Sequence, residues 1–165
     1  MREASARGVV CDLACGRGRH ALAAAGLGAR VVAIDARAEA LRELAGRARA
    51  RALPIAPLRA DLETPHGIPL RPGSCGAILV FRFLFRPLAR AIVACLAPGG
   101  LLLYETFTRQ QREVPYGPRN EAFLLEPGEL PALFPGLEIL DASEGWTPGP
   151  RPEALARLAA RKPDR

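Results

Sequence analysis

Two carboxylates near the amino end of the chain follow apolar segments, and a glycine-containing loop comes directly after the first of them. Residues 9–13 are apolar apart from Asp12 and lead into a loop that contains Gly16 and Gly18. A second apolar segment, residues 31–34, ends at Asp35. This order of strand, glycine loop, helix and second strand ending in an acid is typical of a cradle for a nucleoside ligand.

Each of these residues has an expected part in binding. A side chain at Gly16 or Gly18 would keep a ligand away from the backbone, so both glycines are expected to expose the N–H groups that open the next helix. Asp12 is expected on the rim of the loop. Asp35 lies about 20 residues further on, where such folds place the acid that accepts both ribose hydroxyls. The alternative for Asp35 is a helix N-cap, a position that Asp favours.

Two kinds of cofactor fit the loop. The spacing Gly16-x-Gly18-x-x-Ala21 matches a dinucleotide fingerprint, whereas Asp12-x-Ala14-x-Gly16-x-Gly18 resembles motif I of S-adenosylmethionine-dependent methyltransferases. A dinucleotide brings a pyrophosphate, beside which an acid is unfavourable. S-adenosylmethionine carries a cationic amine and no phosphate, so Asp12 favours S-adenosylmethionine over NAD.

Strands and helices that alternate along the chain must position these residues. Apolar patterning and Gly or Pro breaks predict helices at 19–25, 38–52, 87–96 and 127–134, and strands at 8–13, 30–35, 55–59, 75–81, 101–105 and 137–142. On propensity alone residues 154–161 fit a strand or a helix equally well, and the family resemblance given below favours a strand. Residues 106–127 form a long polar stretch, which is typical of a lid or binding loop.

Alternating strands and helices imply right-handed crossovers and a parallel sheet that helices cover on both faces. Ligands of such folds bind at the carboxyl ends of the strands. Five residues fall at those ends and are expected to meet at one edge of the sheet: Asp12, Asp35, Asp61, Phe81 and Glu105.

Composition narrows the class of protein. The 165 residues fit one domain, 1–165, with 49% hydrophobic residues. No apolar run approaches the roughly 20 residues of a membrane span, and no cleavable leader precedes residue 8, so a cytoplasmic protein without membrane contact is expected. The four cysteines lack CxxC spacing and are expected to be reduced, and His20 and His66 form no zinc pattern, so no metal is predicted.

The net charge of +6 raises the question of nucleic-acid binding. Arg47, Arg49 and Arg51 alternate along a predicted helix and therefore point to different faces instead of forming one basic stripe. A nucleic-acid partner is therefore disfavoured.

Several further segments resemble class I S-adenosylmethionine-dependent methyltransferases over nearly the whole chain, and within them the tellurite-resistance (TehB-like) branch. The matching segments are residues 12–20 (DLACGRGRH), 60–63 (ADLE), 85–88 (FRPL), 96–100 (LAPGG) with 104–107 (YETF), and 123–130 (FLLEPGEL). The resemblance implies a Rossmann-like, mostly parallel α/β sheet of seven strands in the order 3-2-1-4-5-7-6, with the last strand antiparallel and helices on both faces.

The same resemblance implies S-adenosylmethionine as cofactor and a set of binding residues. Asp12 and the glycine loop are expected near the methionine moiety, Asp35 on the ribose, and Asp61 with Leu62 beside the adenine. The full expected set is Asp12, Ala14, Cys15, Gly16, Gly18, His20, Asp35, Ala36, Arg37, Asp61, Leu62 and Phe81.

The chain departs from the family pattern in two places. Ala14 stands where many relatives have Gly, which is tolerable if Ala14 keeps a negative φ. Few residues precede the first strand, so the helical cap over the cofactor is expected to be missing or short. The acceptor site is then open or completed by a second subunit, and the chain is expected to be a monomer or a homodimer.

Methyl transfer needs an in-line approach, so positioning supplies most of the catalysis. A small-molecule acceptor is expected, such as tellurite, selenite or a thiol. Candidate bases are Tyr104, Glu105 and Tyr116, and candidate anion ligands are Arg82, Arg86 and Arg119. The plainer alternatives are that Tyr104 covers the sheet, that Glu105 pairs with an arginine, and that Arg82 and Arg86 are solvated.

Other functions remain open at this point. An RNA-base methylase typically carries an Asn or Asp, two prolines and an aromatic after the fourth strand, and residues 81–85 (FRFLF) lack that pattern. An RNA acceptor is therefore disfavoured. A protein or peptide acceptor, or a non-catalytic S-adenosylmethionine-binding module, would show the same cradle.

Overall fold

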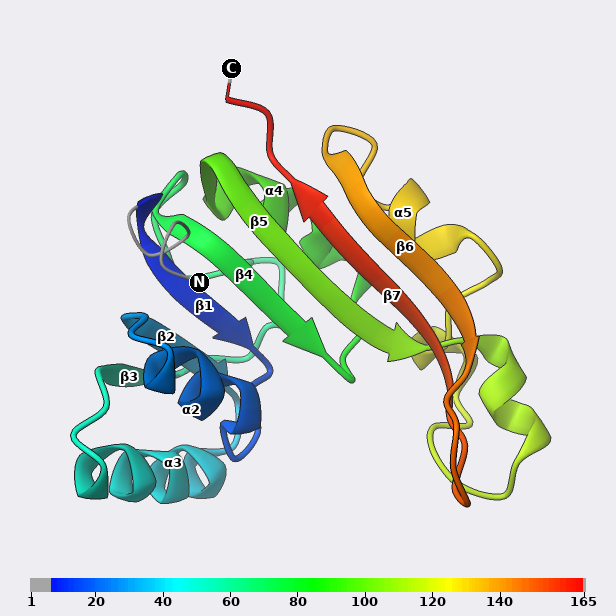
Figure 1. The fold of residues 1–165 in the computed structure, drawn as a ribbon, viewed down its shortest axis with the longest axis horizontal. Coiled ribbons are helices and arrows are strands. Elements are labelled where there is room, and N and C mark those ends of the chain that lie inside the picture. The colour runs from blue at the N-terminus through cyan, green and yellow to red at the C-terminus, as the bar shows by residue number, and fades with distance from the viewer. Residues whose placement is uncertain (1–6, 165) are drawn as a thin grey trace.

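The computed structural model describes residues 7–164, which form a seven-stranded sheet in the order β3-β2-β1-β4-β5-β7-β6 (Figure 1). The strands are β1 (Val9–Leu13), β2 (Val31–Asp35), β3 (Ile55–Arg59), β4 (Cys75–Phe81), β5 (Leu96–Phe107), β6 (Glu138–Trp146) and β7 (Ala154–Arg161). Strands β1 to β5 pair in parallel, whereas β7 is antiparallel to both β5 and β6. The expected order and the antiparallel last strand are confirmed.

Two strands extend beyond their predicted limits. Residues 97–100, which lie between the predicted helix 87–96 and the predicted strand 101–105, already belong to β5 together with Leu96, and the pairing register with β4 shifts between Cys75 and Ala77. Backbone bonds between Gly99 and Lys162 and between Lys162 and Gly100, both of 2.9 Å, hold this segment against the end of the chain. Strand β6 continues to Trp146 because the antiparallel hairpin with β7 supplies a pairing partner along its whole length.

The helices are α2 (Arg19–Gly26), α3 (Ala38–Ala50), α4 (Ala89–Cys95) and α5 (Glu129–Ala132), with short 3-10 turns at Arg86–Leu88, Arg109–Glu113 and Glu121–Phe123. The helix predicted over 87–96 is therefore divided into a 3-10 turn and α4. The helix predicted over 127–134 shrinks to four residues. Gly128 enters it with a φ of 72°, and Pro131 lacks an N–H for helix bonding. None of the helices within residues 7–164 is long and apolar enough to cross a membrane.

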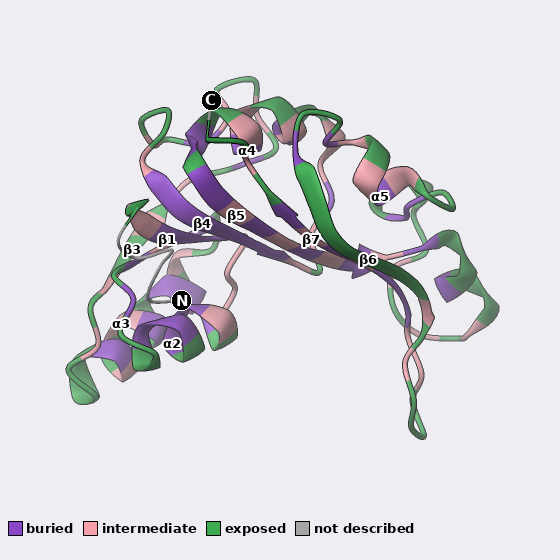
Figure 2. Ribbon diagram, turned by 45° about the horizontal axis from the view of Figure 1, so that its top comes forward, coloured by how far each residue is buried: buried purple, intermediate pink, exposed green. Residues whose placement is uncertain are grey.

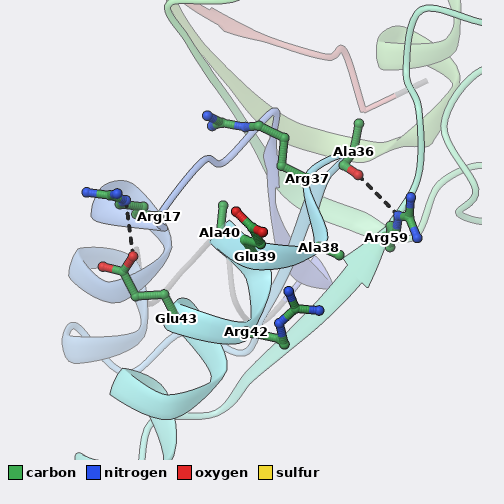
Figure 3. A pocket seen from close by; sticks show the side chains of 9 residues that line it. All are labelled: Arg17, Ala36, Arg37, Ala38, Glu39, Ala40, Arg42, Glu43 and Arg59. Atoms are coloured by element: carbon green, nitrogen blue, oxygen red, sulfur yellow. Dashed lines mark hydrogen bonds and ion pairs between the residues drawn. The ribbon is translucent and has the colours of Figure 1, made fainter.

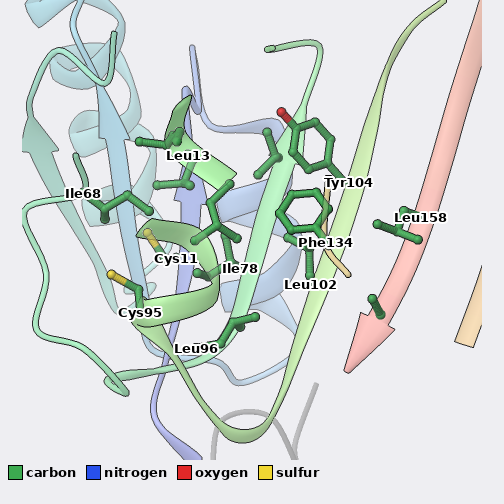
Figure 4. Close-up of a cluster of buried hydrophobic side chains, with 14 of the residues drawn as sticks. Cys11, Leu13, Ile68, Ile78, Cys95, Leu96, Leu102, Tyr104, Phe134 and Leu158 are labelled. Atoms are coloured by element: carbon green, nitrogen blue, oxygen red, sulfur yellow. The ribbon is translucent and has the colours of Figure 1, made fainter. Parts of the chain in front are cut away.

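Alternate side chains of the central strands face two separate cores. Val10 and Leu79 pack with α2 and α3, whereas Cys11 and Ile78 pack with α4 and α5 on the opposite face. The burial colours show the central strands covered and most of β6 exposed (Figure 2). In the larger core, the Phe134 ring lies 5.9 Å from that of Tyr104 (Figure 4).

The polar stretch after β5 is anchored by Arg86. Its guanidinium donates to both carboxylate oxygens of Glu129 and to the carbonyls of Ala122 and Leu124. Gln111, fully buried, accepts from the Ala154 N–H at 2.8 Å and donates to the Tyr116 carbonyl at 3.0 Å. Arg86 therefore fixes this segment against the sheet while its side chain stays partly exposed, and its role as an oxyanion ligand stays a prediction.

Gly18 serves helix packing. It enters α2 with a φ of 74°, and a Cβ built there would overlap Cδ1 and Cδ2 of Leu44 in α3. Leu44 is fully buried, so its side chain would have to repack within the core to make room. The structure gives Gly18 a packing role that the sequence did not predict, because a side chain there would push against Leu44 of α3. Obstruction of a ligand by a side chain at Gly18 stays a prediction.

We expect Gly18→Ala to destabilise the fold by about 2–4 kcal/mol, because left-handed strain adds to overpacking against Leu44. Gly28→Ala is the matched control, since Gly28 also has a positive φ, 90°, with no atom within 4 Å of a built Cβ. We expect about 1–2 kcal/mol there. Urea unfolding of both variants gives the two free energies, and equal losses would contradict the packing role.

Candidate active site

The loop after β1 turns through three left-handed residues. Their φ angles are 52° for Ala14, 55° for Gly16 and 74° for Gly18. The expectation that Ala14 keeps a negative φ is wrong, and this conformation costs an alanine about 1–2 kcal/mol. The Cys15 N–H donates to the Ile34 carbonyl at 2.9 Å, so the bond to β2 helps to hold the loop in this shape.

Asp12 lies beneath the loop instead of on its rim. Its side chain is 1% exposed, and Oδ2 accepts a hydrogen bond of 2.9 Å from the Ala21 N–H in the first turn of α2. Burial raises the pKa of this carboxyl from 3.8 to about 7, the Ala21 bond opposes that rise, and the negative charge of Asp35 adds to it. Asp12 therefore connects β1 to α2, and the expected position on the rim is wrong.

Asp35 links the loops that follow the first two strands. Oδ2 accepts from the Gly16 N–H at 2.7 Å, and Oδ1 accepts from the Arg37 N–H at 2.9 Å and from Arg37 Nε at 3.3 Å. The N-cap position of α3 belongs to Arg37, so the alternative of Asp35 as that N-cap is wrong. A Cβ at Gly16 would come within 3.3 Å of Arg37 Nη2, which leaves little room for a side chain in the loop.

A cavity of about 460 Å³ lies beside Asp35 and runs across the ends of β2 and β3 to the residues after β4. Six of the predicted binding residues line it, namely Ala14, Asp35, Ala36, Arg37, Asp61 and Leu62. The predicted residues outside its lining are Asp12, Cys15, Gly16, Gly18, His20 and Phe81. Binding by any of the twelve stays a prediction. Sequence reasoning missed Ala60, Glu63 and Phe83, and placed Arg82 only among the candidate anion ligands.

The charges of this first cavity suit a cationic or neutral ligand. Three carboxylates line it, Asp35, Asp61 and Glu63, against two arginines. Arg37 bonds to Asp35, and Arg82 bonds to acids outside the cavity. A pyrophosphate entering here would meet three acids and two paired cations. A nucleoside with a positive charge would find hydroxyl acceptors and favourable electrostatics.

Arg82 occupies a strained position directly after β4. Its φ is 60°, and its N–H donates to the Glu105 carbonyl at 2.8 Å. Its guanidinium pairs with Glu105 at 3.3 Å and with Glu153 at 2.7 Å, and lies 4.7 Å from the centre of the Phe107 ring. A non-glycine residue with positive φ costs about 1–3 kcal/mol and persists only where its surroundings hold it.

The candidate bases on β5 are occupied by other partners. Glu105, with 16% of its side chain exposed, bonds to Arg82 and accepts from Arg157 Nε at 2.8 Å. Tyr104 is 4% exposed and donates to the Phe83 carbonyl at 3.1 Å. Burial raises the pKa of Tyr104 well above its ordinary range, so its phenol keeps its proton. The plainer alternatives are confirmed, because Glu105 forms ion pairs with arginines and Tyr104 is buried against the sheet.

The candidates in the loop after β5 are also engaged. The Tyr116 hydroxyl donates to the Pro152 carbonyl at 2.8 Å, and Arg151 lies 4.5 Å from the centre of its ring. Arg119 donates to the carbonyls of Arg112 and Val114 at 3.1 and 3.0 Å. Neither residue lines the first cavity. Both side chains hold the loop in place.

A second cavity of about 350 Å³ adjoins the first one. It shares Glu63, Arg82 and Phe83 with the first cavity, and Leu84, Thr106, Phe107, Pro118 and Phe123 complete its lining. Sequence reasoning missed these last five residues. The sequence did contain a signal for this cavity. Three phenylalanines within residues 81–85 place aromatic side chains directly after the fourth strand, where base methylases carry a polar motif.

A third cavity, about 540 Å³, lies beside the start of α3 and shares Ala36 and Arg37 with the first (Figure 3). Arg17 pairs with Glu43 at 3.1 Å, and Arg59 donates to the Ala36 carbonyl at 3.2 Å. Exposed charged side chains form most of its wall. It reaches neither Asp35 nor the residues after β4, so the first two cavities are better placed for chemistry at the strand ends.

The predicted residues His20 and Phe81 form a stacked pair. Their ring centres are 3.7 Å apart at an interplanar angle of 25°. Burial, followed by the charge of Arg19, lowers the pKa of His20 below 6.5. The lowered pKa favours the neutral form of His20, which stacks on Phe81 as an aromatic group.

Known proteins resemble this chain in sequence and in fold. Residues 10–100 match the family described as "Methyltransferase domain". The fold is similar to TehB from Haemophilus influenzae, at 20% identity and a TM-score of 0.79, over 93% of this chain but 57% of TehB. It is also similar to S-adenosylmethionine-dependent methyltransferases from Methanosarcina mazei (17% identity, TM-score 0.74) and Mesorhizobium loti (21%, 0.73), each over 94% of this chain and 92% of the other. A search of curated protein sequences finds no match.

The buried Asp12 predicts an unusual pH dependence of stability. Its folded pKa of about 7 exceeds the 3.8 of an exposed carboxyl, so the folded state keeps a proton that the unfolded state loses. The free energy of unfolding should therefore fall between about pH 4 and pH 7, by on the order of 3 kcal/mol. Asp12→Asn removes this titration while its amide oxygen still accepts from Ala21.

The measurement is urea unfolding at about pH 4.5 and pH 8. We expect Asp12→Asn to gain stability relative to the native chain as pH rises. Asp141→Asn, at an exposed position on β6, controls for the loss of one negative charge. A difference between Asp12→Asn and the native chain that is the same at both pH values would show that Asp12 ionises normally.

Proposed function

The chain belongs to the methyltransferase domain family, and from this premise we propose that it transfers a methyl group from S-adenosylmethionine to a small-molecule acceptor. The observation that carries the proposal is the pair of adjoining cavities at the carboxyl ends of the strands, joined by Glu63, Arg82 and Phe83. One cavity suits a cationic nucleoside, and the other gives space for a second molecule beside it. Transfer between two bound molecules requires this arrangement.

The residues of the first cavity fit S-adenosylmethionine. Asp35 uses part of its hydrogen-bonding capacity on Gly16 and Arg37, and a carboxylate has about four lone-pair sites, so it can still accept from ribose hydroxyls. Leu62 and Phe83 offer apolar surface to an adenine, and Asp61 and Glu63 supply negative charge. When bound, S-adenosylmethionine supplies a methyl carbon activated by a neighbouring sulfonium.

The side chains around the cavities act by positioning. Tyr104 and Glu105 are committed to Phe83, Arg82 and Arg157, so neither is available to take a proton from an acceptor. An acceptor that already presents a lone pair needs no such help. Chalcogen oxyanions such as tellurite or selenite and thiols meet this condition, and similarity to TehB supports placing the chain in the tellurite-resistance branch.

A non-catalytic S-adenosylmethionine-binding module would bind the cofactor through the same cavity. Turnover separates the two functions. Formation of S-adenosylhomocysteine that depends on an added acceptor supports the enzyme, and binding without any such turnover supports the module.

We expect Asp35→Ala to weaken S-adenosylmethionine binding by about tenfold to thousandfold, because charge-assisted hydrogen bonds contribute roughly 1.5–3 kcal/mol each. Calorimetric titration of purified protein measures the affinity, with NAD as a second ligand. Asp141→Ala is the matched control, since it removes an aspartate on the exposed edge strand β6. Equal affinity in Asp35→Ala and Asp141→Ala would sink the assignment of Asp35, and binding of NAD alone would overturn the proposed function.

A further inference from the structure

The second cavity is lined mainly by apolar side chains, which distinguishes it from a site built for anions. Phe83, Phe107 and Phe123 contribute three aromatic side chains, and Leu84 and Pro118 add aliphatic surface. Its volume of about 350 Å³ falls in the lower part of the range for small-molecule sites. A compact apolar molecule would replace water on these surfaces, and burying one phenyl group contributes about 1.5–3 kcal/mol.

The cation in its wall is already neutralised. Arg82 has ion pairs to Glu105 and Glu153, and its flat face covers Phe107. Glu63, the other charged residue of the lining, is an acid. An anionic acceptor would therefore enter beside an acid and would have to share the guanidinium with Glu105 and Glu153, which already balance its charge. The arginines suggested as oxyanion ligands, Arg86 and Arg119, do not line this cavity.

The commitments of Tyr104 and Glu105 favour an acceptor that reacts without a strong base. Alcohols and ordinary amines are almost wholly protonated near pH 7 and need a base, and the candidate bases Tyr104 and Glu105 are committed elsewhere. A thiol is ionised to a few per cent at that pH, and its sulfur is strongly nucleophilic.

On the basis of the proposed function, we propose that the acceptor is an uncharged apolar thiol, bound in the second cavity against Phe83, Phe107 and Phe123. The thiol binds in its neutral form and gives its proton to water as its sulfur lone pair forms a new bond to the methyl carbon. The bond between that carbon and the sulfonium sulfur breaks, and its electron pair stays on the departing S-adenosylhomocysteine. The products are a neutral methyl thioether and S-adenosylhomocysteine.

The experiment compares two thiols that differ by one carboxylate group, and it adds two inorganic oxyanions. Purified protein with S-adenosylmethionine receives phenylmethanethiol, 4-(mercaptomethyl)benzoate, tellurite or selenite, and S-adenosylhomocysteine formation is measured. We expect kcat/KM for phenylmethanethiol to exceed that for its carboxylated analogue by about tenfold or more, since the added carboxylate must be desolvated beside Glu63. Equal or better turnover of the carboxylated thiol, tellurite or selenite would overturn the proposal.

Phe123→Ala tests the cavity itself. Phe123 is 42% exposed, so its removal is tolerable for the fold. We expect KM for phenylmethanethiol to rise about tenfold, with little change in kcat or in the affinity for S-adenosylmethionine. The control is Leu27→Ala, which truncates a side chain that is 62% exposed and lines neither cavity. An unchanged KM in Phe123→Ala would contradict binding in this cavity.

The two proposals fail in different ways. Loss of the proposed function would appear as no binding of S-adenosylmethionine in calorimetry. Loss of the acceptor proposal would appear as normal S-adenosylmethionine binding without transfer to phenylmethanethiol. Titration of phenylmethanethiol into the S-adenosylhomocysteine complex adds a readout besides turnover, and absence of binding there overturns the acceptor proposal even if the cofactor site is intact.

Discussion

The hydrogen bond from the Gly16 N–H to Asp35 Oδ2, 2.7 Å long, joins the loops that follow the first two strands of the sheet. The same carboxylate accepts from the Arg37 N–H and thereby sets the start of α3. Asp35 therefore determines how far apart the loop of β1 and the loop of β2 stand, and with them the wall of the first cavity. A parallel sheet brings both strand ends to one edge, so one carboxylate can reach both loops.

Two aspartates near each other in this region have different environments and different roles. Asp12 is enclosed beneath the glycine loop and bonds to Ala21, and burial raises its pKa to about 7. Asp35 lines the cavity and accepts from Gly16, and in the proposed function it also accepts from the ribose of the cofactor. Fixing Asp35 in advance reduces the ordering that a ligand must bring about, which is the general advantage of a preorganised site.

A network of charged side chains lies at the carboxyl ends of β4 and β5, on the other side of the two cavities from Asp35. Arg82 holds Glu105 on β5 and Glu153 next to β7, and Glu105 in turn holds Arg157. The network neutralises the arginine while it fixes the hairpin of β6 and β7 relative to β4. The same ion pairs that hold the strained backbone at Arg82 also neutralise the cation in the lining of the second cavity. The structure therefore bears on whether the acceptor is charged.

The sequence by itself determined the alternation of strands and helices, the glycine loop and the acids at the ends of the first three strands. These features depend on local patterns, since apolar runs and Gly or Pro breaks act over a few residues. The tertiary structure alone decided the partners of Arg82, Arg86 and Glu105, because Glu153, Glu129 and Arg157 lie far along the chain from them. It also decided that Asp12 is buried and that Gly18 meets Leu44, since burial and close approach arise only when separate elements pack together.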